Sequence, residues 1–360
     1  MPGWSLTERW PKDCSLCRPN AGVVMKLIYA RDAILADAPY VRANLYGTRR
    51  LHGGFDGRGS YISPRTLGRW PAIRAWRDHL LAEGGELIDA STQVLRAPHY
   101  PSAAQMKLLL QNGVTLPLWN SLTTIGIIEG RGRMLTTVTA PNFQSMIEGD
   151  ISGTATAHLN KGLLVAHGLD EGGDGTDRIG AHDAMWFLVR DLALGEGLHP
   201  IPELAGREVR PGSELREMPA LSPEAEGLIK LLMNVLMVEI RAERGFAFNI
   251  ALLRDSELFT GRRHEAELAA TIVSQIQQDE APHVAYLQLV ISEMRRFQFK
   301  TADGRIEGKT LIDPLWAKVS AWHANQVPLL QREAARELVR ECLAQRKDGK
   351  SLMERFDALE

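Results

Sequence analysis

The chain has 360 residues, of which 24% are charged and 44% hydrophobic, and its 42 basic and 44 acidic residues nearly cancel. This length allows about two average domains, and the formal net charge of −2 excludes a global attraction to nucleic acid or to an anionic membrane. No apolar run reaches the ~18 residues of a membrane span, no secretory signal opens the chain, and three cysteines do not make a disulfide framework. We therefore expect a cytoplasmic globular protein without a membrane partner.

The first part of the chain, residues 1–140, is rich in turn formers and predicts an N-terminal α+β region of short elements. Helices are expected over about 71–83 and 102–111, and Ser102 with Gln105 has the spacing of a capping box at the start of the second. The segment from Thr123 to Val138 contains two β-rich runs around a Glu-Gly-Arg-Gly sequence. This pattern predicts a β-hairpin.

The rest of the chain has a long helical pattern. We expect helices over about 142–168, 179–194, 222–254 and 264–297, then a hairpin at Asp303-Gly304 and a last helix over about 314–346 with a kink at Pro328. The sequence thus predicts a mainly α protein, with a four-helix bundle at 141–300 and a C-terminal hairpin and helix at 301–360 that pack on the bundle.

Two helices carry acidic residues within their apolar stripes. Glu239 and Glu243 lie one turn apart in the stripe of the helix at 222–254, and Glu280 and His283 lie on the apolar face of the helix at 264–297. The Glu-x-x-His spacing directs a carboxylate and an imidazole to one side of a helix. A buried carboxylate is costly unless it is paired or bound to a metal, so these four residues are candidate metal ligands.

In these motifs the chain, over about residues 142–297, resembles the ferritin-like di-metal carboxylate proteins. The resemblance implies a four-helix bundle in which each helix pair supplies one Glu and one Glu-x-x-His to two iron or manganese ions. The matching residues are Glu239 or Glu243, followed by Glu280 and His283.

The other helix pair departs from this pattern, because Ile179 occupies the Glu position three residues before His182. The helix at 142–168 offers Glu148, Asp150, His158 and His167, and the ten-residue spacing of Glu148 and His158 resembles that of haem-oxygenase-like di-iron oxygenases. Mixed carboxylate and imidazole ligation suits iron or manganese better than magnesium. The expected ligand set is Glu148, His158, His182, Glu239 or Glu243, Glu280 and His283; core or surface histidines are the alternative for His158, His167 and His182.

Three further features have simpler interpretations. Glu196 and His199 repeat the Glu-x-x-His spacing, but Gly and Pro around them predict a loop. Cys14 and Cys17 have the spacing of half a zinc site or of a redox pair, or are free thiols. The arginines between residues 42 and 77, interleaved with aromatic residues, form a site for an anionic group or a solvated surface.

The function expected from these features is that of a non-haem di-iron oxidase or oxygenase, which activates O2 on a small organic, anionic substrate. The N-terminal region would shape the substrate pocket, and an electron donor and a homodimer are the expected partners. The alternative is a metal-free helical binding or scaffold protein in which Glu239 and Glu243 pair with arginines such as Arg241 and Arg244. Iron storage or peroxide detoxification fits less well, because such bundles need no large N-terminal region.

Overall fold

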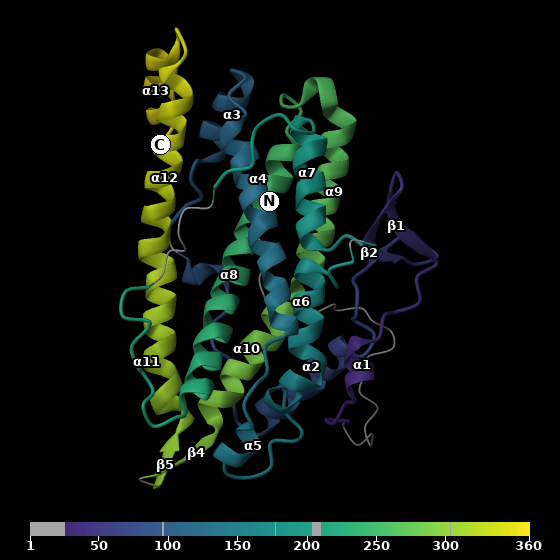
Figure 1. The fold of residues 1–360 in the computed structure, drawn as a ribbon, viewed down its shortest axis with the longest axis vertical. Coiled ribbons are helices and arrows are strands. Elements are labelled where there is room, and N and C mark those ends of the chain that lie inside the picture. Colours follow the sequence, from purple (N-terminus) through teal and green to yellow (C-terminus); the bar gives the residue numbers. More distant parts are fainter. Residues whose placement is uncertain (1–25, 96, 177, 204–209, 303) are drawn as a thin grey trace.

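Helices make up most of the structure, as the sequence predicts (Figure 1). The computed structural model describes residues 26–95, 97–176, 178–203, 210–302 and 304–360. In chain order the helices are α1 (Arg31–Leu35), α2 (Arg69–Ala82), α3 (Ala103–Gln111), α4 (Leu116–Gly132), α5 (Phe143–Met146), α6 (Leu164–Gly172), α7 (His182–Leu194), α8 (Pro223–Arg254), α9 (Arg263–Asp279), α10 (Ala281–Arg296), α11 (Gly308–Ala321), α12 (Val327–Ala344) and α13 (Gly349–Asp357).

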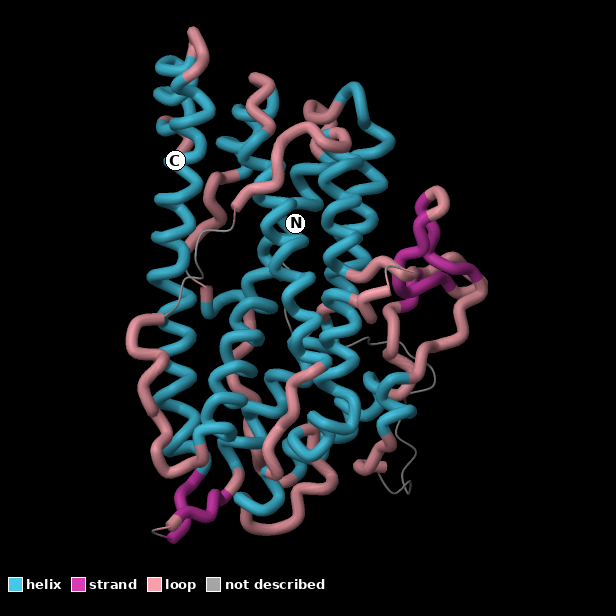
Figure 2. Tube along the Cα trace, viewed as in Figure 1, coloured by secondary structure: helices cyan, strands magenta, loops and turns pink. Residues whose placement is uncertain are grey.

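Strands occur at the periphery of the helical body (Figure 2). The antiparallel strands β1 (Arg42–Tyr46), β2 (Arg49–Phe55) and β3 (Tyr61–Ile62) form one small sheet, in the order β1-β2-β3. The backbone of Gly180 joins this sheet to the body, since it exchanges hydrogen bonds of 2.8 Å with His52 and Arg50. At the lower end, β4 (Gln298–Thr301) and β5 (Gly304–Glu307) form the hairpin that the sequence predicts.

The centre of the body is built by α4, α7, α8, α9 and α10. Helix α4 packs on α7 and α6, α7 packs on α9, and α8 packs on both α9 and α10. The 32-residue helix α8 begins where the sequence predicts, because Ser222 caps its first turn and accepts a hydrogen bond from the amide of Ala225. The capping box of Ser102 and Gln105 at α3 is also confirmed.

Buried apolar residues form two separate clusters along the body. One contains Leu232–Ile240 of α8 and Val284–Met294 of α10, and the other contains Phe246–Leu253 of α8 and Ala269–Ile276 of α9. The break between α9 and α10 and the middle of α8 therefore lie at the boundary between the two clusters. The charged residues of the candidate site are found at this boundary.

The predicted β-hairpin at Thr123–Val138 is wrong, because most of this segment lies in α4. Its glycines permit close helix packing: a Cβ at Gly126 would lie 2.7 Å from the Phe187 ring, and one at Gly132 would lie 2.6 Å from Glu171 Cβ. Burial against α7 and α6 outweighs the β propensity of the segment. A helix from the first 140 residues thus belongs to the helical body.

The predicted continuous helix at 142–168 is also wrong. Only α5 and the start of α6 are α-helical there, and a π-helical turn, Leu159–Leu163, precedes α6. Gly162 has φ of +120° within this turn, a conformation that needs glycine. The helix is therefore interrupted just before α6, the helix that contributes residues to the candidate site.

The helices predicted over 264–297 and 314–346 are both interrupted. The helix predicted over 264–297 breaks at Glu280, where Pro282 enters the first turn of α10. The last helix begins earlier than predicted, at Gly308, and a π-helical turn, Trp322–Gln326, separates α11 from α12 just before Pro328. Figure 1 shows α11, α12 and the additional helix α13 in one column beside the body.

Candidate metal centre

Seven buried side chains converge where the two apolar clusters meet. They comprise four carboxylates and three imidazoles, and they form two groups of four that share Glu171. Within each group the nearest nitrogen and oxygen atoms all lie within 4.8 Å of one another. The seven residues are Glu129 of α4, His167 and Glu171 of α6, His182 of α7, Glu239 of α8, and Glu280 and His283 at the α9–α10 break.

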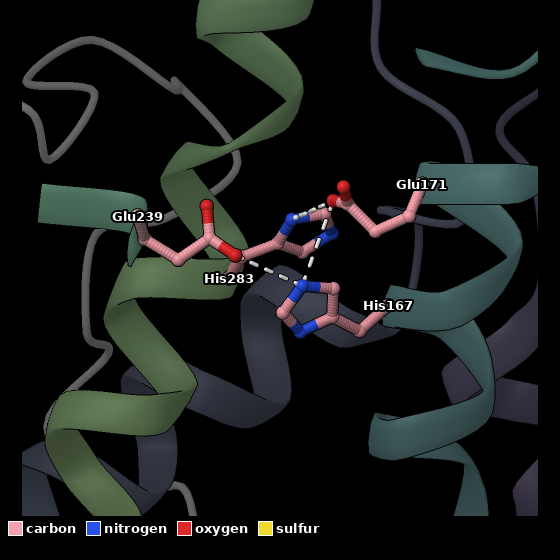
Figure 3. A group of neighbouring side chains, drawn as sticks. All are labelled: His167, Glu171, Glu239 and His283. Carbon is pink, nitrogen blue, oxygen red and sulfur yellow. Dashed lines mark hydrogen bonds and ion pairs between the residues drawn. The ribbon is translucent and has the colours of Figure 1, made fainter. Parts of the chain in front are cut away.

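The first group contains His167, Glu171, Glu239 and His283 (Figure 3). His167 Nε2 lies 3.1 Å from Glu239 Oε1 and 3.5 Å from Glu171 Oε1. His283 Nδ1 lies 3.1 Å from the same oxygen of Glu171. The two imidazole rings stack with their centroids 3.8 Å apart, and one nitrogen of each faces Glu171.

The second group contains Glu129, Glu171, His182 and Glu280. His182 Nδ1 lies 2.9 Å from Glu280 Oε1, 3.4 Å from Glu171 Oε1 and 3.6 Å from Glu129 Oε2. The other oxygen of Glu280, Oε2, lies 2.6 Å from His283 Nδ1. Glu171 and Glu280 therefore connect the two groups, each with contacts to histidines on both sides.

A further polar residue faces the outer nitrogen of each histidine, and it makes a hydrogen bond in the case of His283 and His167. His283 Nε2 donates to Asp170 Oδ2 at 2.9 Å, and His167 Nδ1 lies 2.8 Å from Tyr286 Oη. His182 Nε2 lies 3.5 Å from Asp279 Oδ2. Hydrogen bonds such as those of His283 and His167 fix the tautomer and the orientation of metal-binding imidazoles.

The two outer carboxylates are held in turn by the N-terminal region. Asp170 forms ion pairs with Arg65 and with Arg69, whose Nη2 lies 2.7 Å from Oδ2. Asp279 accepts a hydrogen bond of 2.8 Å from Tyr61 Oη and lies 3.1 Å from His52 Nε2. The loop before α2 and the β1–β3 sheet thus support the histidine side of the cluster.

Burial and mutual repulsion change the protonation of the inner carboxylates. Burial raises the pKa of Glu171 well above its ordinary value, and the charge of Glu129 adds to this effect. Burial also raises the pKa of Glu280, together with the charges of Glu171 and Glu239. Without a cation, both carboxyl groups therefore retain protons far above their usual pH range.

Two of the histidines bind protons more tightly than usual. Burial opposes the charged form of His167, but the contacts with Tyr286 and Glu239 outweigh it and raise its pKa to about 10. Burial likewise opposes the charge on His182, yet the carboxylates of Glu280 and Glu171 raise its pKa well above the ordinary value. The pKa of His283 is instead lowered, by burial and by the positive charge of His167.

The cluster fits metal ions better than it fits protons alone. Glu171 Oε1, Glu280 Oε1 and His182 Nδ1 are buried and accept or donate no hydrogen bond within the described residues, and all three belong to the second group. Two ligand atoms in adjacent positions ~2.1 Å from one ion are about 3 Å apart, close to the separations found here. Buried polar atoms without partners are costly, and a shared cation would satisfy all three.

The charge of the cluster supports the same conclusion. The inner carboxylates and the outer pair, Asp170 and Asp279, make six acidic groups, against which Arg65 and Arg69 supply two positive charges. With neutral imidazoles, four negative charges remain when every carboxyl group is ionised. Two divalent cations would balance them. These buried histidine and acidic groups could therefore hold metal ions.

Four of the predicted ligands meet in the cluster: His182, Glu239, Glu280 and His283. Between the alternatives Glu239 and Glu243, the structure places Glu239 in the cluster, whereas Glu243 is half-buried and accepts a hydrogen bond from Gln277 at 3.2 Å.

Glu148 and His158 lie outside the cluster, so their inclusion in the ligand set is corrected. Glu148 is exposed and pairs with Arg305 at 2.9 Å. His158 is a buried core residue whose Nε2 accepts from the amide of Tyr29, while its ring lies 4.5 Å from that of Trp76. Residues 142–163 do not form one continuous helix, so the ten-residue spacing of Glu148 and His158 does not place them on one helix face.

Three of the seven residues were absent from the predicted ligand set: Glu129, His167 and Glu171. Glu129 was missed because its segment was predicted to form a β-hairpin rather than a helix. His167 and Glu171 do carry a visible signal, because they are four residues apart and therefore share a helix face.

The second Glu-x-x-His pair has no part in the cluster. Glu196 and His199 follow the end of α7, and His199 Nε2 lies 2.8 Å from Thr115 Oγ1. Cys14 and Cys17 lie outside the described residues. A cavity of about 400 Å³ lined by residues between Ala140 and Lys161 shares no residue with the two groups.

Comparison of the chain with models of known protein families, with curated proteins and with solved structures finds no match. Among the described residues, no helix combines the length and the apolar character that crossing a membrane requires. The functional argument therefore depends on the geometry of the cluster.

Proposed function

We propose that this protein is a non-haem di-metal oxidoreductase that uses two iron ions to activate O2 on a small organic substrate. The observation that carries the proposal is the pair of ligand groups joined by Glu171 and Glu280. Glu129 and His182 would hold one ion, His167, Glu239 and His283 would hold the other, and Glu171 and Glu280 lie between the two groups. The four glutamates and the Glu280-x-x-His283 motif resemble the ferritin-like di-metal pattern, whereas the third histidine departs from it.

The donor set favours iron, with manganese as the other suitable metal. Oxygen and imidazole ligands without thiolate suit these metals, while magnesium prefers oxygen ligands and water. Two ferrous ions would supply the electrons that O2 reduction requires, and an external donor would restore them.

The chain's own residues would orient and protect such a centre. Asp170 and Tyr286 hold the outer nitrogens of His283 and His167, so that the opposite nitrogens face the carboxylates of the cluster, and Asp279 lies beside the outer nitrogen of His182. The apolar clusters on both sides exclude bulk water, which strengthens the electrostatic interactions inside.

Two arginines of the N-terminal region, Arg65 and Arg69, form ion pairs with Asp170, so these two do not favour the expected binding of an anionic substrate. For the metal-free scaffold alternative, two of the residues named have other contacts: Glu239 contacts His167, and Arg244 donates to the Leu95 carbonyl.

Metal analysis tests the proposal directly. Protein purified without chelator, or reconstituted with ferrous iron under anaerobic conditions, should contain about two ions per chain. The ferrous protein should then consume O2 on mixing, and a Glu171→Ala, Glu280→Ala double variant should not. A chain that binds no iron or manganese after reconstitution would support the scaffold alternative.

A further inference from the structure

The three-stranded sheet β1–β3 carries basic side chains that the metal cluster does not use (Figure 2). Its exposed arginines are Arg42 of β1, Arg49 and Arg50 of β2, and Arg58 of the turn between β2 and β3. Asp56 is the one acidic residue between positions 41 and 77 of the sequence. Its carboxylate accepts hydrogen bonds from the backbone amides of Arg58 and Ser60 in that turn. The sheet therefore has an excess of positive charge.

The charges of these four arginines are not neutralised within the part of the chain that the structure describes. Arg42 lies over the ring of Phe55, with its Cζ atom 4.5 Å from the ring centroid, and none of the four forms an ion pair there. Arg65 and Arg69, in contrast, pair with Asp170. Four free guanidinium groups on one small sheet attract an acidic surface.

Exposed aliphatic side chains lie among the arginines. β1 is at the edge of the sheet, and Val41 and Leu45 are 75% and 59% exposed. Leu45 is paired with Arg50 across the two strands, so both side chains lie on one face, and the neighbouring pair, Asn44 and Leu51, is buried on the other. A protein partner can bury these aliphatic groups inside a charged rim, whereas nucleic acid is bound chiefly through its phosphates. The combination favours an acidic protein.

The buried side of the same sheet reaches the candidate metal centre. His52 follows Arg50 by two residues on β2, which is about 7 Å along a strand. Its Nε2 lies 3.1 Å from Asp279 Oδ2, and that oxygen lies 3.5 Å from His182 Nε2. The rings of His52 and His182 have their centroids 4.9 Å apart. A short path thus connects the basic surface with a candidate metal ligand.

We propose that the exposed face of the β1–β3 sheet is the docking surface for an acidic protein that carries a one-electron redox group and supplies electrons to the metal centre. This inference depends on the proposed function, since it assigns a surface and a partner class to the external donor of that centre. Each encounter would oxidise the carrier by one electron. Two encounters would therefore reduce two ferric ions to the ferrous state, and no atoms are exchanged between the proteins.

Docking can be measured on the full-length metal-free chain, so that the result does not depend on iron. The probes are a plant-type [2Fe–2S] ferredoxin and a flavodoxin, which are small acidic one-electron carriers, in calorimetric titrations at low salt. The wild type should bind at least one carrier, with an affinity that falls as salt is added. An Arg49→Glu, Arg50→Glu double variant should bind about tenfold more weakly, or less. The matched control, Lys347→Glu with Lys350→Glu, makes the same change of net charge at exposed residues near the start of α13 and should bind as the wild type does.

A second variant and a second readout complete the test. Leu45→Asp should also weaken docking, because it places a carboxylate in the aliphatic part of the surface. In the iron-loaded protein, the arginine double variant should be reduced more slowly than the wild type by limiting carrier, whereas dithionite, which needs no docking, should reduce both at similar rates.

Three results would overturn the docking surface: no binding of either carrier, equal binding by the wild type and the arginine double variant, or binding of a single-stranded DNA oligonucleotide in place of the carriers. A chain that binds a carrier through the sheet but takes up no iron or manganese would instead contradict the proposed function, while the docking surface itself would stand.

Discussion

Asp170 Oδ2 accepts a hydrogen bond from His283 Nε2 at 2.9 Å, and this contact determines which imidazole nitrogen faces the cluster. Arg65 and Arg69 hold the pKa of Asp170 well below its usual range even though burial opposes its charge. The ionised carboxylate keeps the proton of His283 on Nε2. The lone pair of Nδ1 is then directed at Glu280 and Glu171.

Asp170→Asn should therefore weaken both the fold and metal binding. The substitution leaves the buried Arg69 without the counter-charge of Asp170, which typically costs about 3–5 kcal/mol. Loss of the negative charge beside His283 Nε2 should reduce metal affinity by about 10–100-fold. Chemical denaturation of the metal-free protein and metal titration measure the two effects. Adding Arg69→Met should recover part of the stability but none of the affinity; a normal affinity in Asp170→Asn would contradict the assignment of His283.

Glu239→Ala and Glu243→Ala form a matched pair one helical turn apart. Only Glu239 lies in the cluster, so its variant should lose at least one metal ion per chain, while Glu243→Ala should keep full metal content. Elemental analysis of both reconstituted proteins gives the answer. Equal metal loss in the two variants would show that the cluster extends further along α8 than the structure indicates.

Glu280→Ala should abolish binding of at least one metal ion and leave the metal-free protein as stable as the wild type, or more so. The reason is that removal of this buried carboxyl group relieves its desolvation and its repulsion by Glu171 and Glu239. Thermal melts of the two metal-free proteins test this expectation. A loss of about 3–5 kcal/mol with unchanged metal content would mark Glu280 as one half of a structural ion pair.

The metal-free protein should become less stable as the pH rises from 6.5 to 10. The folded-state pKa of His167 is raised from 6.5 to about 10, so its stabilising contribution is complete below pH 6.5 and is lost as the pH passes 10. The raised pKa values of Glu171 and Glu280 act in the same direction above pH 4.5.

Metal binding should show the opposite trend, because the ions displace these protons. The difference in melting temperature between loaded and metal-free protein should widen with pH over this range, and loading in weak buffer should release protons. His167→Gln should flatten the pH dependence of the metal-free protein. A metal-free protein that grows more stable from pH 6.5 to 10 would refute these assignments.

Gly132→Ala should destabilise the protein, although alanine is the better helix former. Its Cβ would lie 2.6 Å from both Cβ and Cγ of Glu171, which forces apart α4 and α6 and displaces the shared carboxylate. We expect a loss of about 1–3 kcal/mol together with weaker metal binding. In α8, Gly245→Ala is the control, because nothing lies within 4 Å of the added atom and the helix should gain about 1 kcal/mol. A stabilised Gly132→Ala variant with normal metal content would show that α6 can move away at little cost.

The sequence was most informative where a single helix contains both an apolar stripe and the candidate ligand residues. Ser222, Pro223 and the apolar stripe of α8 are local signals, and they placed Glu239 on the buried face before any tertiary contact was known. Glu280 and His283 were found in the same way, because a three-residue spacing keeps two side chains on one face even though Pro282 stands between them and the helix breaks there.

The tertiary structure decided which residues complete the cluster. Glu129 lies in a segment whose β-branched residues and glycines predict a hairpin, and only packing against α6 and α7 makes it helical. The π-helical turn before α6 interrupts the helix predicted at 142–168. Glu148 and His158 therefore lie outside the cluster, and His167 and Glu171 of α6 lie within it. The sequence by itself therefore determined a helical protein with buried carboxylates on two helices, since helix periodicity is a local property. The pairing of those carboxylates with α4, α6 and α7 depended on contacts between residues far apart in the chain, which no local pattern encodes.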